Sequence, residues 1–209
     1  MKKNEFSFKK SENSVFFLLF KCKMALFLYF WYLMKKIILI TGGQRSGKSS
    51  FAEKLALSLS PNPIYIATAH IWDEEFRQRV IRHQQRRGRN WINIEEEKYL
   101  SKHHIHNKVC VIDCITLWCT NFFFDSTKKE TNQPSINEVL QNLKDEFDHF
   151  TQQDATFIFV TNEIGSGGVS NSSVQRRFTD LQGWMNQYVA AKANEVILMV
   201  SGIPVKIKE

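Results

Sequence analysis

The residues with the clearest chemical role lie in one short stretch, "LITGGQRSGKSSF" at positions 39–51. It contains the pattern G-x-x-x-x-G-K-S between Gly42 and Ser49. Glycines in such a loop let successive backbone N–H groups surround an oxyanion. A lysine then reaches the β- and γ-phosphates, and a serine hydroxyl binds Mg²⁺. We therefore interpret the stretch as a phosphate-binding loop in which Lys48 is catalytic and Ser49 is a magnesium ligand.

A second distinctive segment is the helix expected over residues 73–87, within "DEEFRQRVIRHQQRRGRNW". Arg79, His83 and Arg87 recur every four residues, so they form one stripe along the helix. Neighbouring guanidinium groups disfavour imidazolium, which leaves His83 neutral and able to act as a nucleophile. An anion over the stripe would relieve the repulsion between its charges. A solvated basic face is the alternative, and the helix alone does not decide between them.

Two further groups of polar residues follow apolar runs. Asp113 ends "VCVID", where a carboxylate in phosphate-binding-loop proteins holds the Mg²⁺ shell. Alternatively, it caps the helix that follows. "FIFVTNEIGSGG" places Asn162 and Glu163 after a buried run, at the sheet edge where ligands gather in open α/β folds. We expect Asp113 to bind magnesium, and Asn162 and Glu163 to contact phosphate or substrate.

The elements that must position these residues are predicted from alternating apolar runs and helical patterns, as in an α/β sheet. The expected strands span Lys36–Thr41, Ile64–Ala67, Trp91–Glu95, Val109–Cys114, Thr156–Thr161, Glu195–Val200 and Pro204–Lys208. The expected helices span Lys48–Ser60, Asp73–Arg87, Ile115–Phe124, Ile136–Gln152 and Ser173–Ala193. We therefore predict a mostly parallel sheet flanked by helices and closed by an antiparallel hairpin of the last two strands.

The last of these helices carries polar residues that need partners. Arg176 either pairs with Asp180, four residues on, or reaches a phosphate. Gly183 costs roughly 1 kcal/mol relative to Ala inside a helix. We therefore expect Gly183 to pack closely against another element or another subunit. At least one of Asn186 and Gln187 should be hydrogen-bonded.

Length and composition are those of a single globular domain, with 209 residues, 43% hydrophobic and 23% charged. The formal net charge is +7. Residues 1–33 contribute +4 of this charge, because they hold six Lys and two Glu. The remaining chain is only mildly basic, so we predict no nucleic-acid partner.

The extension 1–33 differs from the rest of the chain, and it holds seven of the 17 Phe. Its apolar stretch is nearly long enough to span a bilayer, but Lys21 and Lys23 interrupt it. It also resembles a signal peptide, although no small-residue cleavage site precedes the domain. We favour a misassigned start, with Met34 as the true first residue, over a membrane-associating segment. The domain is then 34–209, and membrane contact is expected only through 1–33.

The cysteines and histidines do not form a recognisable metal site. The cysteines are Cys22, Cys110, Cys114 and Cys119. No C-x-x-C pair is present, so we expect buried free thiols in a reducing compartment, and we predict a cytoplasmic protein. "HHIH" at 103–106 lies in a polar connection without an obvious fourth ligand, so we interpret it as a solvated loop.

Taken together, these motifs resemble the bifunctional adenosylcobinamide kinase / adenosylcobinamide-phosphate guanylyltransferase family of cobalamin biosynthesis. The resemblance runs from about Lys35 to Lys208. It rests on "ITGGQRSGKS", "YIATA" followed by "DEEFRQRVIRHQQRRGRNW", "VIDCITLW-x-x-N", "VTNEIGSG", "RRFTDLQGWMNQYVAAKANEV" and "SGIPVKIK". The glycine loop alone specifies a superfamily, whereas the histidine segment and the long final helix, in this order, are far more selective.

The resemblance implies two reactions on one P-loop NTPase sheet of the recombinase type. A nucleoside triphosphate, ATP or GTP, phosphorylates the aminopropanol hydroxyl of adenosylcobinamide. A histidine that matches His83 then attacks the α-phosphate of GTP and carries GMP to adenosylcobinamide phosphate, giving adenosylcobinamide-GDP. Arg79 and Arg87 would offset charge on the phosphoryl oxygens. The resemblance also implies Mg²⁺ as cofactor and a homotrimer.

The same resemblance, with the motifs above, assigns roles residue by residue. Nucleotide contacts in the glycine loop are Gly42, Gly43, Gln44, Arg45, Ser46, Gly47, Lys48, Ser49 and Ser50. Nucleotide contacts in later segments are Ala69, His70, Ile71, Arg87, Gly88, Arg89, Asn90, Glu95 and Asp113. The catalytic residues are His83 and Lys48, and the magnesium ligands are Ser49 and Asp113. The residues at the phosphate or substrate are Arg79, Asn162, Glu163 and Arg176.

The chain departs from the family pattern at four positions. Ser170 stands where proline is usual, Thr179 where arginine is usual, Asn194 where aspartate is usual, and Asp113 where some relatives carry glutamate. The first change loosens the glycine-rich loop after the "VTNE" motif. Two other classes of function stay open: another P-loop kinase or ATPase, in which His83 is a surface residue, and a nonenzymatic GTP-binding regulator. Against the regulator, the sequence contains no N-K-x-D guanine-recognition motif.

Overall fold

A computed structural model describes residues 35–71, 73–74, 77–78, 80–81, 85, 87–124 and 135–209. The predictions for the extension 1–33, for Arg79 and His83, and for most of the polar loop 126–135 lie outside these described residues. Within the predicted helix 73–87, the described residues at 74, 77, 78, 80, 81 and 85 are helical, whereas those at 73 and 87 lie in bends.

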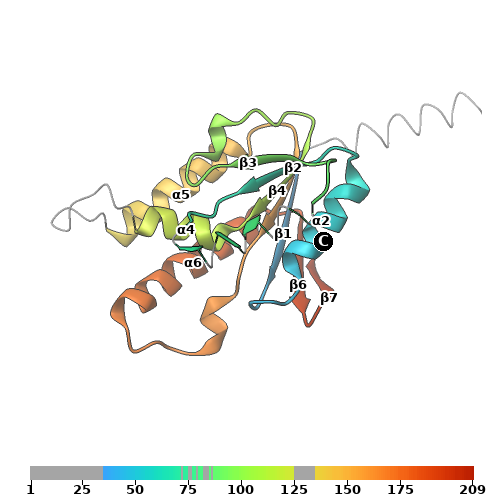
Figure 1. Cartoon of the computed structure of the whole chain (residues 1–209). Helices are drawn as coiled ribbons and strands as arrows, with labels where there is room; N and C mark the ends of the chain where they lie inside the picture. Colours follow the sequence, from blue (N-terminus) through green and yellow to red (C-terminus); the bar gives the residue numbers. More distant parts are fainter. Residues whose placement is uncertain are drawn as a thin grey trace, which may run out of the picture. The chain divides into compact units, whose positions relative to one another are not determined.

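A seven-stranded sheet forms the frame of the domain (Figure 1). Its strands are β1 (Lys36–Gly42), β2 (Ile64–Ala67), β3 (Ile92–Glu95), β4 (Val109–Asp113), β5 (Thr156–Val160), β6 (Glu195–Val200) and β7 (Ile203–Lys208). Their order across the sheet is β3-β2-β4-β5-β1-β6-β7. All described pairings are parallel except that of β6 with β7. The predicted fold class is therefore confirmed, hairpin included.

The strand register brings the predicted site residues to one edge of the sheet. Ala67 of β2 is paired with Glu95 of β3 on one side and with Asp113 of β4 on the other. Asp113 is in turn paired with Val160 of β5, and Val160 with Ile40 of β1. The carboxyl ends of five parallel strands thus form one row, and the glycine loop continues directly from β1.

Helices cover both faces of the sheet (Figure 1). The α-helices are α2 (Lys48–Leu59), α4 (Ile115–Phe123), α5 (Ile136–Phe150) and α6 (Ser173–Lys192), and the 3₁₀ helices are η1 (Leu100–Lys102) and η3 (Ile164–Gly167). Ser135 begins α5 with a complete capping box, in which its side chain and that of Glu138 each accept from the other's backbone N–H. For the elements listed above, the predicted boundaries agree with the observed ones to within two residues, because apolar periodicity and caps mark them well.

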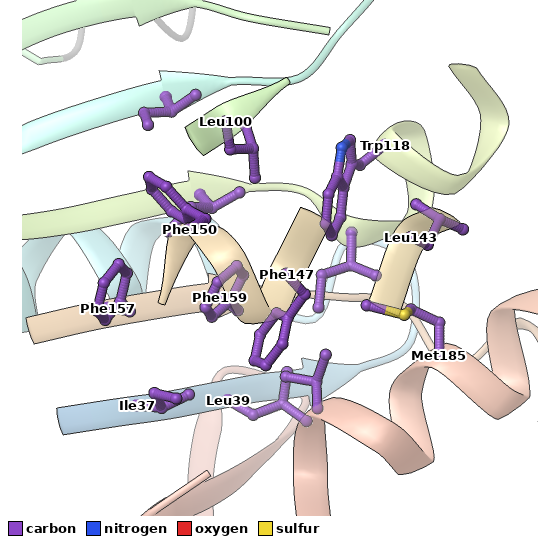
Figure 2. Close-up of a cluster of buried hydrophobic side chains, with 14 of the residues drawn as sticks. Ile37, Leu39, Leu100, Trp118, Leu143, Phe147, Phe150, Phe157, Phe159 and Met185 are labelled. Atoms are coloured by element: carbon purple, nitrogen blue, oxygen red, sulfur yellow. The ribbon is translucent and has the colours of Figure 1, made fainter. Parts of the chain in front are cut away.

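Alternate residues of β1 separate two hydrophobic clusters. Ile37 and Leu39 face α4, α5 and α6, whereas Ile38 and Ile40 face α2. The first face is filled by aromatic rings, and Figure 2 shows how Phe147 of α5 lies against the strands. On the second face, α2 contributes the small side chains of Ala52 and Ala56, which are fully buried against the sheet. The close approach of α2 to the sheet fixes the end of the glycine loop.

The cysteines that the structure describes have the predicted environment. Cys110, Cys114 and Cys119 are buried free thiols. Burial raises the pKa of Cys114 to about 12 and that of the other two still further, so all three stay protonated at neutral pH. Among the described residues, no three His, Cys, Asp or Glu side chains are grouped as metal ligands. Within the same part of the chain, every helix is too short or too polar to cross a bilayer.

Candidate nucleotide-binding site

The glycine loop connects β1 to α2 through two backbone conformations that require glycine. Gly42 has a φ of 146°, and a Cβ atom on it would lie 2.5 Å from the Met199 carbonyl oxygen of β6. Gly47, the residue before α2, is left-handed with a φ of 93°. A side chain at Gly42 would therefore force β1 and β6 apart. The first turn of α2 carries no acidic residue, so its positive end stays available to an anion.

Two neighbouring segments brace this loop. Gly202 in the β6–β7 turn donates its N–H to the Ser46 carbonyl at 3.0 Å. Ser201 and Gly202 both have positive φ, as a two-residue hairpin turn requires. On the other side, the Glu163 N–H donates to the Gly42 carbonyl at 3.2 Å. The loop is therefore held from the hairpin and from the end of β5.

Lys48 lies inside the loop, and only 7% of it is exposed. Its Nζ donates to the Gly43 carbonyl at 2.5 Å and to Ser46 Oγ at 3.4 Å. Ser49 follows in the first turn of α2. This arrangement places a buried ammonium group inside the loop, next to a backbone carbonyl and a serine hydroxyl. It can exchange its carbonyl contact for a phosphate oxygen without leaving the loop.

Asp113 ends β4, and its carboxylate is held by a buried tyrosine. The Tyr65 hydroxyl donates to Asp113 Oδ2 at 2.6 Å. Burial, followed by the nearby Asp113 charge, holds the pKa of Tyr65 well above its usual value, so the phenol remains a donor. The capping alternative for Asp113 is wrong, because Cys114 is the N-cap of α4 and no side chain caps it. Carboxylate and hydroxyl oxygens are typical magnesium ligands, so Asp113 and Ser49 fit that ion.

Arg87 is buried beside the same tyrosine, although an arginine in a basic stripe was expected to face an anion. Only 4% of Arg87 is exposed, and its Cζ lies 3.6 Å from the centre of the Tyr65 ring. Its Nε donates to Asn93 Oδ1 at 2.9 Å, and its Nη1 lies 4.0 Å from Glu53 Oε1 of α2. We call these residues (Glu53, Tyr65, Arg87 and Asn93) the Arg87 cluster. It connects the end of segment 73–87 to α2 and to Asp113.

Glu163 lies beside the glycine loop and is held by two donors. Its Oε1 accepts from Thr41 Oγ1 at 2.6 Å and from Asn186 Nδ2 at 3.3 Å. Asn186 Oδ1 accepts from Thr161 Oγ1 at 2.7 Å. The expected hydrogen bonding of Asn186 is therefore confirmed, whereas Gln187 is exposed.

Further hydrogen bonds extend from Asn186 across α6. Gln182, which is fully buried, donates to Thr116 Oγ1 at 2.7 Å and to the Asn162 carbonyl at 2.8 Å. Asn162 itself donates to Thr116 Oγ1 from Nδ2 at 3.0 Å. We call Thr116, Thr161, Asn162, Gln182 and Asn186 the amide network. Gln182 and Thr116 were not predicted, although Gln182 lies four residues before Asn186 and so on the same helix face.

The other predicted nucleotide contacts lie around β2 and β3: residues 69–71 follow β2, Glu95 is the last residue of β3, and residues 88–90 precede β3. Glu95 ends β3, two strands from Asp113, which is about 10 Å at the usual interstrand spacing. His70 follows β2, and its Nδ1 lies 2.8 Å from Glu97 Oε1. Ala69 and Ile71 on either side of His70 are half-buried. The remaining predicted contacts, Gly88, Arg89 and Asn90, are exposed.

For Arg176 and Gly183 of α6, one of the two alternatives expected from the sequence is not observed. Arg176 donates to the carbonyls of Ser170 and Asn171, both at 2.9 Å, rather than to Asp180. The segment after Glu163 begins with the 3₁₀ helix η3. The expected close packing of Gly183 against another element is wrong within the described chain, since a Cβ atom there would meet nothing within 4 Å. Contact with another subunit is the alternative that stays open.

Known proteins similar to the chain cover nearly all of this domain. The family model for cobinamide kinase / cobinamide phosphate guanyltransferase matches residues 38–207. The bifunctional adenosylcobalamin biosynthesis protein CobU of Escherichia coli is 39% identical over 185 residues, which cover 82% of this chain and 99% of that protein. CobU of Salmonella typhimurium is 35% identical, with the same coverage of both chains. CobP of Pseudomonas aeruginosa is 33% identical and covers 81% of this chain and 96% of its own.

Proposed function

The chain belongs to the cobinamide kinase / cobinamide phosphate guanyltransferase family, and from this membership we propose how its site works. It is a bifunctional enzyme of adenosylcobalamin biosynthesis. It phosphorylates adenosylcobinamide with a nucleoside triphosphate and then transfers GMP from GTP to adenosylcobinamide phosphate. The observation that carries this conclusion is the match over residues 38–207, which includes the complete glycine loop.

In the kinase step, we propose that the glycine loop holds the triphosphate. Lys48 is buried within reach of the loop carbonyls, so it can follow the β- and γ-phosphates as charge moves onto the leaving group. Ser49 and Asp113 would hold Mg²⁺, which neutralises phosphate charge when bound. Because the Tyr65 hydroxyl donates to Asp113 Oδ2, it fixes the orientation of the carboxylate and leaves Oδ1 as the oxygen that would bind the ion.

In the transfer step, we propose that His83 is the nucleophile. A neutral imidazole nitrogen attacks the α-phosphorus of GTP, and the bond to the bridging oxygen breaks to release pyrophosphate. The phosphoramidate is then attacked by a phosphate oxygen of adenosylcobinamide phosphate, which frees the histidine. Arg79 and Arg87 flank His83 at helical spacing, and their positive charges favour the neutral, nucleophilic form of its imidazole. The buried position of Arg87 supports this proposal, because it ties the end of that segment to α2, which carries Lys48.

The proposal is tested by incubating the protein with GTP labelled at the α-phosphate. Acid-labile, base-stable label is expected on the wild-type protein and is expected to be absent from His83→Ala. The matched control is His104→Ala, which removes an exposed histidine outside the site and should keep full labelling. Labelling of His83→Ala at the wild-type level would remove the histidine from the mechanism. No label on any variant would favour the other P-loop kinase that the sequence left open.

The finer properties that the family resemblance implies are also proposals. We propose a cytoplasmic homotrimer that acts on small molecules and not on nucleic acid. The edge strand β7 supports assembly, since Ile203, Val205 and Ile207 are each more than 40% exposed. Light scattering after size-exclusion chromatography should give three times the monomer mass of 24.5 kDa. A monomer mass at micromolar concentration would contradict the proposal.

A further inference from the structure

Glu163 is a carboxylate placed next to a loop that binds a polyanion. Its backbone N–H donates to the Gly42 carbonyl at 3.2 Å, and its side chain accepts from Thr41, one residue before that glycine. A carboxylate in this position repels phosphate oxygens. Its presence therefore needs a chemical reason other than direct phosphate binding.

The two oxygens of Glu163 have different surroundings. Oε1 accepts from both Thr41 Oγ1 and Asn186 Nδ2. Within the part of the chain that the structure describes, no hydrogen bond reaches Oε2, and the residue as a whole is exposed. One oxygen is thus held while the other remains open to solvent at the mouth of the loop. This asymmetry is what a general base requires.

The support behind Oε1 is rigid. Only 8% of Asn186 is exposed, and its amide bonds to Thr161 and to the Asn162 carbonyl as well as to Glu163. Gln182 donates to the same Asn162 carbonyl. Glu163 therefore keeps its direction through the amide network, while Asp113, at the end of the adjacent strand β4, supplies the carboxylate suited to magnesium.

Resting on the kinase function proposed above, we propose that Glu163 is the proton acceptor of the phosphorylation step. The hydroxyl oxygen of the cobinamide aminopropanol group attacks the γ-phosphorus of the nucleotide. The bond from that phosphorus to the β,γ-bridging oxygen breaks, and the nucleoside diphosphate leaves. The hydroxyl proton moves to Glu163 Oε2 and then to solvent. The guanylyl-transfer step needs no such acceptor, because its nucleophile is a neutral imidazole.

The decisive variant is Glu163→Gln, since the glutamine carbonyl oxygen can still accept from Thr41 and Asn186. We measure cobinamide phosphorylation at saturating substrates, the dissociation constant of a fluorescent GTP analogue, and protein labelling by α-phosphate-labelled GTP. A lost general base lowers kcat by about 100-fold or more. Nucleotide affinity and labelling are expected within twofold of wild type. The matched control is Asp154→Asn, an exposed carboxylate at the opposite end of β5, which should keep all three properties.

Each alternative result has a separate meaning. Phosphorylation within threefold of wild type in Glu163→Gln would overturn the inference while leaving the proposed function intact. A joint loss of affinity, labelling and phosphorylation would also overturn it, because Glu163 would then position the loop and not the proton. If the wild-type protein neither phosphorylates cobinamide nor takes up label, the proposed function fails, and the inference fails with it.

Discussion

On the β1–β5 side of the carboxyl edge, neutral amides and hydroxyls hold the elements together, whereas on the β2–β3 side a buried guanidinium lies on a tyrosine ring. The amide network shares its acceptors, since the Asn162 carbonyl accepts from both Gln182 and Asn186. In the Arg87 cluster a single guanidinium, on a residue that is 4% exposed, contacts Glu53, Tyr65 and Asn93. An acceptor that loses one of two neutral donors stays hydrogen-bonded, whereas removing the buried guanidinium removes an ion pair, a charged hydrogen bond and a ring contact at once. The two sides should therefore respond differently to substitution.

The largest effect is expected in the Arg87 cluster. Arg87→Met keeps much of the side-chain volume but removes the ion pair with Glu53, the hydrogen bond to Asn93 and the positive charge over the Tyr65 ring. Losing these three interactions together is expected to cost about 2 kcal/mol or more in the free energy of unfolding. Urea unfolding measures this loss, with Arg177→Met, an exposed arginine on α6, as the control. A loss no larger than that of the control would mean that the cluster does not stabilise the fold.

A smaller effect is expected in the amide network. Gln182→Leu removes donors to Thr116 and to the Asn162 carbonyl, yet both acceptors keep another donor. The expected loss in the free energy of unfolding is about 1 kcal/mol, the net value of a typical hydrogen bond. Gln187→Leu, at an exposed position of the same helix, is the control. A loss equal to that of Arg87→Met would show that the amide network is as sensitive to a single substitution as the Arg87 cluster.

The smallest effect at neutral pH is expected from Tyr65→Phe, which keeps the ring under Arg87 and removes only the bond to Asp113. The cost is again about 1 kcal/mol or less, because Asp113 is partly exposed to water. The two proteins should diverge in alkali. Folding raises the pKa of Tyr65, so the stability gained from the protonated phenol is complete below about pH 10, the usual pKa, and is lost as the pH rises toward the folded value.

Unfolding measured between pH 8 and pH 11 checks this difference, because the buried thiols are common to both proteins and cancel in the comparison. Stability of the wild-type protein is expected to fall more steeply above about pH 10 than that of Tyr65→Phe. Parallel curves would show that the Tyr65 hydroxyl does not titrate differently in the folded and unfolded states.

Local signals predicted most of the frame and the centre of the site. Apolar runs marked the strands, and the glycine loop was recognisable because its spacing, the strand before it and the helix after it all agree. What could not be predicted depends on contacts between distant segments. The stacking of Arg87 on Tyr65 joins residues that share no pattern, and charge periodicity alone suggested an exposed arginine. The packing predicted for Gly183 also depends on distant segments. Glycine does destabilise a helix, but within the described chain no other element packs closely against Gly183.

The turn between β6 and β7 lies near the last residues of the sequence, yet it contacts the glycine loop. Gly202 donates its N–H to the Ser46 carbonyl, and a Cβ atom on Gly47 would lie 3.5 Å from Gly202 Cα. Random mutagenesis screened for failure to retain GTP should therefore recover lesions in this hairpin as well as in the loop itself. The β6–β7 hairpin thus supports the glycine loop. Shortening the chain there would deform the loop, even though no residue beyond the turn needs to contact a nucleotide.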